Sequence, residues 1–170
     1  GKEFLDVVAH GNERVLRARL SDAEFFFNED RKLKLEDRLE KLKTVSFQEG
    51  LGNMYDKSER LAKLAEMVKF AINVKVDDTN LKRTALLSKT DLVAGMVVEF
   101  TELQGVMGRE YAKLDGEPAE VTEGIYEHYL PRFAGDELPK GTIGRIVGIS
   151  DKIDNIVATF SRGLAPTGSQ

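Results

Sequence analysis

The segment SDKIDNIVATF, Ser150 to Phe160, carries an acidic side chain on an amphipathic pattern, with an amide four residues further along. Asp151 and Asn155 therefore share one face of a predicted helix. A carboxylate at the start of such a helix can hold a divalent metal ion, and water bound to that ion becomes a nucleophile. One carboxylate alone does not make a metal site, so the other ligands have to be sought elsewhere in the chain.

Two earlier segments complete a candidate site. KSERLAKLA begins at Lys57, ALLSK ends with Ser88 and Lys89, and both precede SDKIDN. In this order the three segments resemble the HD-type metal-dependent phosphohydrolases. In that superfamily the first segment opens with a metal-binding His, the second contains a His-Asp pair and the third contains an Asp. The resemblance places Lys57 at the first His and Ser88 and Lys89 at the His-Asp pair, so that only Asp151 is retained.

These replacements change the chemistry of the site. A lysine ammonium donates hydrogen bonds and has no lone pair for a metal ion, and two ammonium charges repel a divalent cation. We therefore expect no metal here, and we expect Lys57 or Lys89 to form an ion pair with Asp151. Asp91, two residues after Lys89, is a substitute ligand if the helix register slips.

The two histidines of the chain, His10 and His128, lie outside these segments. His128 sits beside Tyr129 in the segment IYEHYL, and we interpret it as a structural histidine whose ring nitrogens are hydrogen-bonded. Neither histidine is assigned to a metal site.

Composition favours a single globular domain, because 41% of the 170 residues are hydrophobic and 32% are charged. The net charge of −4 gives no overall basic field, so any nucleic-acid binding needs a local basic patch. Without cysteine the chain has neither disulfides nor thiolate metal sites. The longest apolar run, LVAGMVV, is too short to cross a bilayer, and the N-terminal residues do not resemble a signal peptide. We expect a soluble cytoplasmic protein.

A 3.6-residue apolar repeat predicts helices along almost the whole chain. The predicted helical segments are 11–34, 35–43, 53–72, 81–89, 90–114, 116–130 and 142–163. The fold class is therefore all-α, a helical bundle of the HD type with an extra N-terminal helical segment. We place that segment and its connection at 1–52, the degenerate HD-like domain at 53–163, and the start of a linker at 164–170.

Longer segments carry a more specific resemblance, to the β subunit of bacterial heterotetrameric glycyl-tRNA synthetase. The segments are GNERVLRARLSDAEFFFNEDRK, SFQEGLGNMYDKSERL, KTDLVAGMVVEFTELQGVMGREYA, IYEHYLPRFAGDELP and DKIDNIVATFSRGLAPTGSQ. They cover almost all 170 residues in the right order. That subunit is several times longer, so we expect this chain to be an internal piece of it.

The resemblance implies that the whole enzyme charges tRNA(Gly) with glycine, and that ATP and Mg²⁺ are used at a class II active site in the α subunit. This chain corresponds to an inactive HD-like domain in the middle of the β subunit, with no cofactor and no catalytic residue of its own. Its implied partners are tRNA(Gly), the α subunit and the remaining β-subunit domains, with no membrane. Three functions stay open: a tRNA-contacting module, an architectural spacer or subunit-docking module, and, as the least favoured, an active phosphohydrolase.

Charge segregation suggests where RNA would bind. Seven acids and one base lie within 115–137, a segment that would repel phosphates. Arg14 and Arg17 share a helical face and could meet adjacent phosphates, with Lys82 and Arg83 as a second choice. The alternative is that such arginines pair with acids of their own chain, for example Glu13 or Glu24, on a solvated face.

Overall fold

The computed structural model describes residues 2–163. In this range all named secondary-structure elements are helices. Apart from helices it contains one isolated antiparallel bridge, between Ser46 and Asn53. The prediction of an all-α bundle is therefore confirmed. The linker predicted at 164–170 lies outside the described residues. No described helix is long and apolar enough to cross a membrane.

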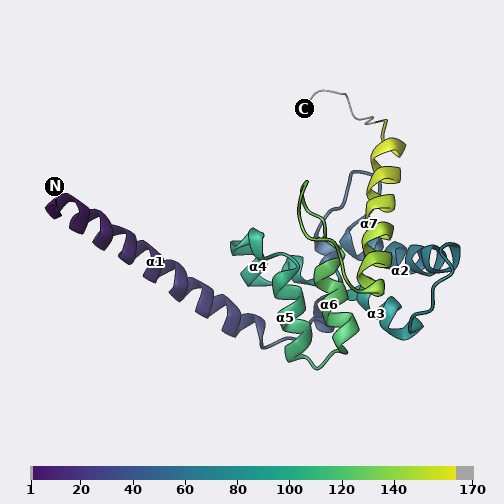
Figure 1. The fold of residues 1–170 in the computed structure, drawn as a ribbon, viewed down its shortest axis with the longest axis horizontal. Helices are drawn as coiled ribbons and strands as arrows, with labels where there is room; N and C mark the ends of the chain where they lie inside the picture. Colours follow the sequence, from purple (N-terminus) through teal and green to yellow (C-terminus); the bar gives the residue numbers. More distant parts are fainter. Residues whose placement is uncertain (1, 164–170) are drawn as a thin grey trace.

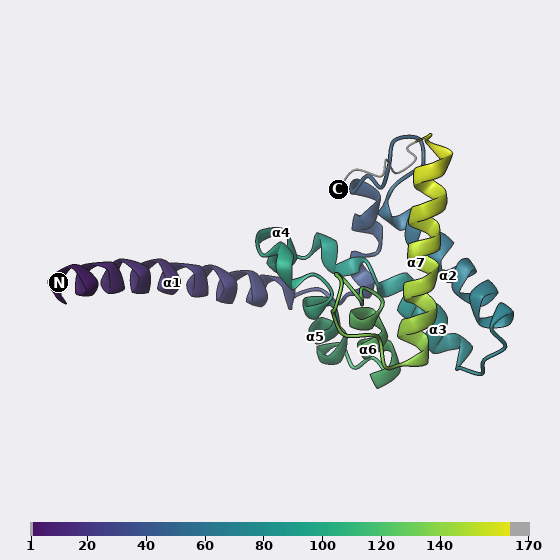
Figure 2. The same ribbon diagram turned by 45° about the horizontal axis from the view of Figure 1, so that its top comes forward.

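The described helices fall into two groups, long α-helices and short 3₁₀ turns (Figures 1 and 2). The α-helices are α1 (Lys2–Asp30), α2 (Met54–Ala71), α3 (Asp78–Leu87), α4 (Gly95–Glu99), α5 (Val106–Leu114), α6 (Ala119–Glu127) and α7 (Thr142–Ser161). The 3₁₀ turns are η1 (Glu36–Arg38), η2 (Glu40–Thr44), η3 (Thr90–Val93) and η4 (Thr101–Leu103).

Helix α1 projects from the body of the molecule as a long arm (Figures 1 and 2). Its apolar side chains Val15, Leu16 and Leu20 are exposed, and only its C-terminal part packs against the body, at α4. There the ring of Phe27 stacks on Tyr111, with the ring centroids 5.9 Å apart. The apolar repeat in this helix therefore marks a face that the described residues leave largely uncovered.

The buried carboxylate of Asp30 fixes the end of α1 to the body. It accepts hydrogen bonds from the backbone N–H groups of Gly95 and Met96, both at 2.8 Å, and from the Tyr111 hydroxyl at 2.9 Å. The buried Arg38 guanidinium lies beside it, 3.4 Å from Oδ1. Because a buried carboxylate needs such donors, Asp30 holds α1, α4 and α5 in one arrangement.

Two apolar clusters fill the body. One combines Leu35 with side chains of α5, α6 and the segment before them: Leu87, Ala94, Val97, Met107, Tyr111, Ala112, Val121 and Ile125. The other joins α2, α3 and α7: Leu61, Ala62, Ala65, Leu81, Ala85, Ile143, Ile146 and Val147. Leu35 thus shares a core with residues of the segment 53–163, and the domain boundary at residue 52 stays a prediction.

Local signals place the helix ends well. Asn53 and Asp56 form a capping box at the start of α2, where the Asn53 side chain accepts from the Asp56 N–H and the Asp56 side chain accepts from the Asn53 N–H, both at 3.0 Å. Asp77 caps α3 by accepting from the Asn80 N–H at 2.8 Å. Gly163 follows α7 with a φ of 70°, in the left-handed region that favours glycine.

In two segments the apolar repeat of the sequence predicts longer helices than the structure contains. Segment 35–43 forms two short 3₁₀ turns, and segment 90–114 forms four short elements instead of one or two helices. Gly105 explains the second case. Its φ is 80°, and a Cβ at this position would lie 2.6 Å from the Tyr129 ring, so the chain turns here under an aromatic side chain.

Candidate functional site

Four parts of the chain bring charged side chains together in the interior. Lys57 comes from the first turn of α2, Lys89 follows α3, His128 ends α6, and Asp151 and Asp154 lie in α7. All five are buried. Asp151 lies in the middle of α7, as the predicted helix over 142–163 places it, and not at the start of a helix.

The ammonium group of Lys57 contacts three side chains of α7. Its Nζ donates to Asp154 Oδ2 and to Asn155 Oδ1, each at 2.8 Å, and lies 2.8 Å from Asp151 Oδ1 in an ion pair. The face of the Phe47 ring covers the same nitrogen at 4.3 Å. A lysine in the first turn of a helix faces the positive end of the helix dipole, so these carboxylates offset an unfavourable position.

Lys89 makes the second set of contacts. Its Nζ donates to Asp151 Oδ2 at 2.9 Å and lies 2.9 Å from His128 Nε2, with the Tyr129 ring 4.2 Å away. The other ring nitrogen of His128, Nδ1, lies 2.7 Å from the Ile125 carbonyl. A carbonyl only accepts, so we assign the proton to Nδ1, and Nε2 then accepts from the ammonium. The expected pairing of Asp151 with a lysine is confirmed, and both lysines take part.

Burial and charge act together on this cluster. Burial by itself would raise the pKa of Asp151, but the ammonium groups of Lys89 and Lys57 outweigh it and hold that pKa well below its usual range. Burial lowers the pKa of Lys89, and the charge of Asp151 opposes this. Burial and the neighbouring Lys89 also lower the pKa of His128 well below 6.5, which keeps the imidazole neutral.

Ser88 and Asp91 take no part in the ion pairs. Ser88 is buried, and its hydroxyl donates to the Ala85 carbonyl of its own helix at 2.8 Å. Asp91 Oδ2 accepts from the backbone N–H groups of Gly105 and Gly108, at 2.6 and 3.2 Å, so it caps the start of α5. Asp91 therefore has a structural partner of its own, and the alternative that it substitutes as a ligand beside Asp151 gains no support from the geometry.

The arrangement gives the carboxylate of Asp151 two internal cations. Metal–ligand bonds to nitrogen and oxygen are about 2.0–2.2 Å long, whereas the lysine contacts of 2.8–2.9 Å are ordinary charge-assisted hydrogen bonds and ion pairs. Within residues 2–163 no group of three or more His, Asp or Glu side chains is arranged to hold a metal ion. The absence of a bound metal in the protein itself stays a prediction.

Sequence reasoning missed two members of the cluster. His128 lies in no motif segment, and the packing of α6 against α3 and α7 brings its ring to Lys89, just after the end of α3. Asp154 did have a signal, since it follows Asp151 by three residues in SDKIDN and so lies on the same helical face.

The candidate RNA-binding residues lie apart from this cluster. Arg14 and Arg17 are exposed on the projecting arm of α1, and Arg17 pairs with Glu13 at 2.7 Å. Lys82 is exposed on α3. Arg83 is bound by two carboxylates of its own chain, Glu36 at 2.9 Å and Glu117 at 2.6 Å. For Arg83 this geometry favours the scaffold alternative, and the other three remain candidates.

The acidic segment 115–137 uses much of its charge internally. Asp115 accepts from the Leu35 N–H at 2.7 Å, and Glu127 accepts from the N–H groups of Lys140 and Gly141 at 2.9 and 2.8 Å. Asp136 pairs with Arg132 at 3.0 Å, as Glu117 does with Arg83. Several of these carboxylates therefore hold loops and helix ends together, and the segment is less of a free acidic surface than its composition suggests.

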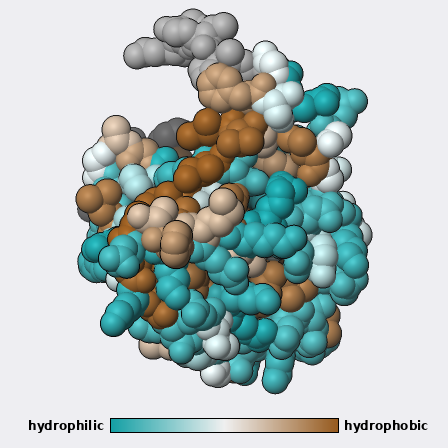
Figure 3. All heavy atoms as spheres, turned by 90° about the vertical axis from the view of Figure 1, so that its right-hand side faces the viewer, coloured by the Kyte–Doolittle hydropathy of each residue, from teal (hydrophilic) through white to brown (hydrophobic). Residues whose placement is uncertain are grey.

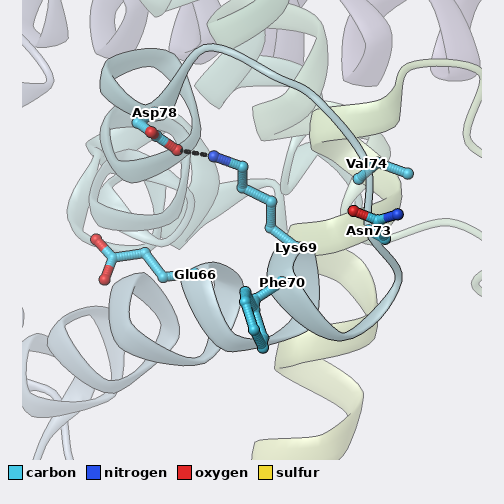
Figure 4. Close-up of a pocket in the computed structure, with 6 residues that line it drawn as sticks. All are labelled: Glu66, Lys69, Phe70, Asn73, Val74 and Asp78. Atoms are coloured by element: carbon cyan, nitrogen blue, oxygen red, sulfur yellow. Dashed lines mark hydrogen bonds and ion pairs between the residues drawn. The ribbon is translucent and has the colours of Figure 1, made fainter.

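A surface hollow of about 500 Å³ lies at the turn between α2 and α3 (Figure 4). Its lining residues are Glu66, Lys69, Phe70, Asn73, Val74 and Asp78. Lys69 and Asp78 form an ion pair across it, and Phe70 is highly exposed at its rim. Because the lining mixes both charges and the hollow is open, we assign no ligand to it.

We expect Lys89→Met to destabilise the fold by about 3 kcal/mol, because it leaves Oδ2 of Asp151 and Nε2 of His128 buried without their donor. The free energy of unfolding in urea measures the loss. Arg17→Met is the control, since it breaks an exposed pair and should cost at most about 1 kcal/mol. Equal losses for both variants would contradict the structural role of Lys89.

A second prediction concerns pH. Burial raises the pKa of Asp91 to about 6, despite the donors at Gly105 and Gly108, from an ordinary value of 3.8. The raised pKa means that the stability Asp91 contributes is fully present below pH 3.8 and is lost as pH rises through 6. The difference amounts to about 3 kcal/mol at 1.36 kcal/mol per unit.

Asp91→Asn removes this titration and can still accept at Oδ1. Relative to the unsubstituted protein, the variant should therefore be about 2.4 kcal/mol more stable at pH 7 than at pH 4, because the carboxyl of the unfolded chain is already more than half ionised at pH 4. Urea unfolding of both proteins at both pH values gives this double difference, in which the titration of His128 cancels. A double difference of zero would show that Asp91 ionises as freely as in the unfolded chain.

Comparison with known proteins agrees with the longer resemblance. The family model of the glycyl-tRNA synthetase β subunit matches residues 2–170. The chain is 53% identical to the glycine–tRNA ligase β subunit of Halothermothrix orenii over 170 residues, 55% identical to that of Clostridioides difficile over 166, and 57% identical to that of Geobacter sulfurreducens over 163.

These alignments cover 99%, 98% and 96% of this chain, but only 25%, 24% and 24% of the three relatives. The chain thus spans about a quarter of the length of the proteins it matches. The match extends along the described residues from α1 to α7, including the segments that supply the lysine and aspartate cluster. On this basis the chain belongs to the glycyl-tRNA synthetase β-subunit family.

Proposed function

We propose that this chain is a non-catalytic domain of a glycyl-tRNA synthetase β subunit, and that it helps to recognise and position tRNA(Gly) for ATP-dependent glycylation. The observation that carries the non-catalytic part is the pairing of Asp151 with Lys57 and Lys89. A carboxylate held by two ammonium groups is not available to a catalytic metal ion. The phosphohydrolase alternative therefore has the least support.

In this proposal the chemistry belongs to the α subunit, which would bind ATP and Mg²⁺ together with glycine. The domain would act on the other substrate, the tRNA, in the cytoplasm. The described cluster is buried and internally neutralised, so the domain would work through its surface. This division of labour is what the family resemblance implies, and the two experiments below test it.

The arm of α1 is the part of the surface best shaped to reach RNA. It projects from the body (Figures 1 and 2), and Arg14 and Arg17 lie on it three residues apart. Arg17 already shares its guanidinium with Glu13, but both side chains are largely exposed, and such pairs exchange readily for phosphate. Lys82 on α3 is the second candidate.

The second candidate function is architectural, as a spacer or subunit-docking module. The observation that favours it is the uncovered apolar face of α1, where Val15, Leu16 and Leu20 are exposed. An apolar face of this kind is typical of a helix that packs against another protein surface. The same arm would then position neighbouring domains or the α subunit rather than RNA.

Removal of this domain from the α/β enzyme separates the two functions. If the domain acts on tRNA, charging of tRNA(Gly) should fall by at least about tenfold while ATP–pyrophosphate exchange stays within about twofold, because activation of glycine needs no tRNA contact. Both rates are measured on the same preparation. A parallel fall in exchange and charging would show that the domain supports the α subunit, and would favour the architectural function.

Arg14→Ala in the full enzyme should weaken tRNA(Gly) binding by about 1 kcal/mol or somewhat more, and should make the affinity less sensitive to salt. We expect the same for Arg17→Ala, reduced by its competition with Glu13. Filter-binding affinities at several salt concentrations, with melting temperatures, provide the measurement.

Arg83→Ala is the matched control for this experiment. Its guanidinium is held by Glu36 and Glu117, so we expect a lower melting temperature and an unchanged salt dependence of tRNA affinity. If Arg14→Ala behaves in the same way as Arg83→Ala, the arm is part of the scaffold and is not the RNA-binding surface.

A further inference from the structure

Helix α7 carries apolar side chains on its buried face and on an open face beside it. One face is buried in the core with Ile143, Ile146, Val147 and Ala158. The other face is open, and we call its side chains the α7 stripe: Ile149 (42% exposed), Ile153 (39%), Ile156 (56%), Val157 (61%) and Phe160 (56%). The spacing of 149, 153, 156 and 160 keeps these side chains in one row along the helix. Apolar atoms form a band on the face of the molecule that carries α7 (Figure 3).

An apolar helical face that is left in water costs free energy unless another surface covers it. Asp151 and Asp154 lie on the buried face of α7, and Arg145 and Lys152 lie on its exposed side next to the stripe. Arg145 donates to the Pro139 carbonyl at 2.9 Å, and Lys152 donates to the Leu130 carbonyl at 3.1 Å. Both cations keep their charge, and the case for a protein partner rests on the apolar side chains of the stripe.

The stripe continues into a shallow apolar hollow of about 220 Å³ beside Ile149. Leu130, Pro131 and Pro139 line it together with the aliphatic parts of the two cationic side chains. The stripe and the hollow together fit a partner with an apolar surface, from which one side chain protrudes into the hollow. RNA offers no such surface, whereas a packed protein segment does.

We propose that another part of the same β-subunit chain packs against the α7 stripe. This proposal rests on family membership and does not depend on the tRNA-binding role. About three quarters of each relative lies outside the aligned segment, so most of the subunit's own surface is absent from residues 2–163. In such a subunit the remaining chain is covalently joined to this segment.

Tethering favours an occupant from the same chain over the α subunit or a second copy. A segment joined by a short connection is present at an effective concentration in the millimolar range, whereas a separate chain binds at its own, lower concentration. The occupant should be an apolar protein surface of interdomain size, which would bury the five side chains of the stripe and leave the cations at its edge in water.

Thiol labelling of the full-length β subunit tests the proposal. This segment contains no cysteine, so Val157→Cys and Val98→Cys each introduce one thiol that peptide mass spectrometry can follow. The two valines are matched, 61% and 66% exposed, but Val98 lies on α4, away from the stripe. The alkylation rate of each is measured in the subunit alone and divided by its rate in urea.

We expect the thiol from Val157→Cys to react at least about tenfold more slowly than in urea, as for a contact that opens at a cost of 1.4 kcal/mol or more. The thiol from Val98→Cys should be slowed less. Equal, unslowed reaction at both positions would overturn the proposal, because the stripe would then be open to water. Protection that is lost on dilution, or that appears only after the α subunit or tRNA(Gly) is added, would overturn it in favour of that other partner.

Ile156→Glu in the same full-length subunit gives a second readout. The substituted side chain is exposed on α7, so the domain itself can tolerate the charge, but a covering segment cannot. We expect the α7 peptide to exchange its amide hydrogens faster than in the unsubstituted subunit, with Val98→Glu as the control. Unchanged exchange would overturn the proposal. Neither measurement uses RNA or aminoacylation, so a failure here is distinct from a failure of the proposed tRNA role.

Discussion

The buried carboxylate of Asp151 is the constraint on which this fold depends. A lone carboxylate in the interior is strongly destabilising, and here two ammonium groups, Lys57 and Lys89, compensate it. These contacts join α2, the turn after α3, and α7, and His128 adds α6 through its hydrogen bond with Lys89. Four segments that are far apart in the sequence therefore share one electrostatic centre, and each is held in the register that satisfies the others.

The same centre balances its own charges without an outside ion. A metal ion would supply positive charge to Asp151 and would take the lone pair of a histidine nitrogen. Lys89 fills both roles, because its ammonium donates hydrogen bonds to Asp151 Oδ2 and to the lone pair of His128 Nε2. The charge balance is thus kept by side chains of the chain itself.

The surface of the described residues differs from this interior. Two apolar helical faces remain uncovered in the described residues, one along the projecting arm of α1 and one on α7. Several carboxylates of the segment 115–137, in contrast, are occupied by backbone donors and arginines of the same chain. The interior charges are therefore paired within the described residues, whereas two apolar faces are uncovered. Uncovered apolar faces agree with a chain that spans about a quarter of the length of its relatives.

The sequence by itself determined what depends on neighbours along the chain. Helical periodicity predicted the all-α fold, and the motif remnants predicted the pairing of Asp151 with lysine. Only the tertiary structure decided which helices meet, and so it placed His128 beside Lys89 and turned Asp91 toward α5. Periodicity shows that one face of a helix is apolar, but not what covers it. That depends on contacts between distant segments, and for this reason the apolar faces of α1 and α7 could be recognised as exposed only in three dimensions.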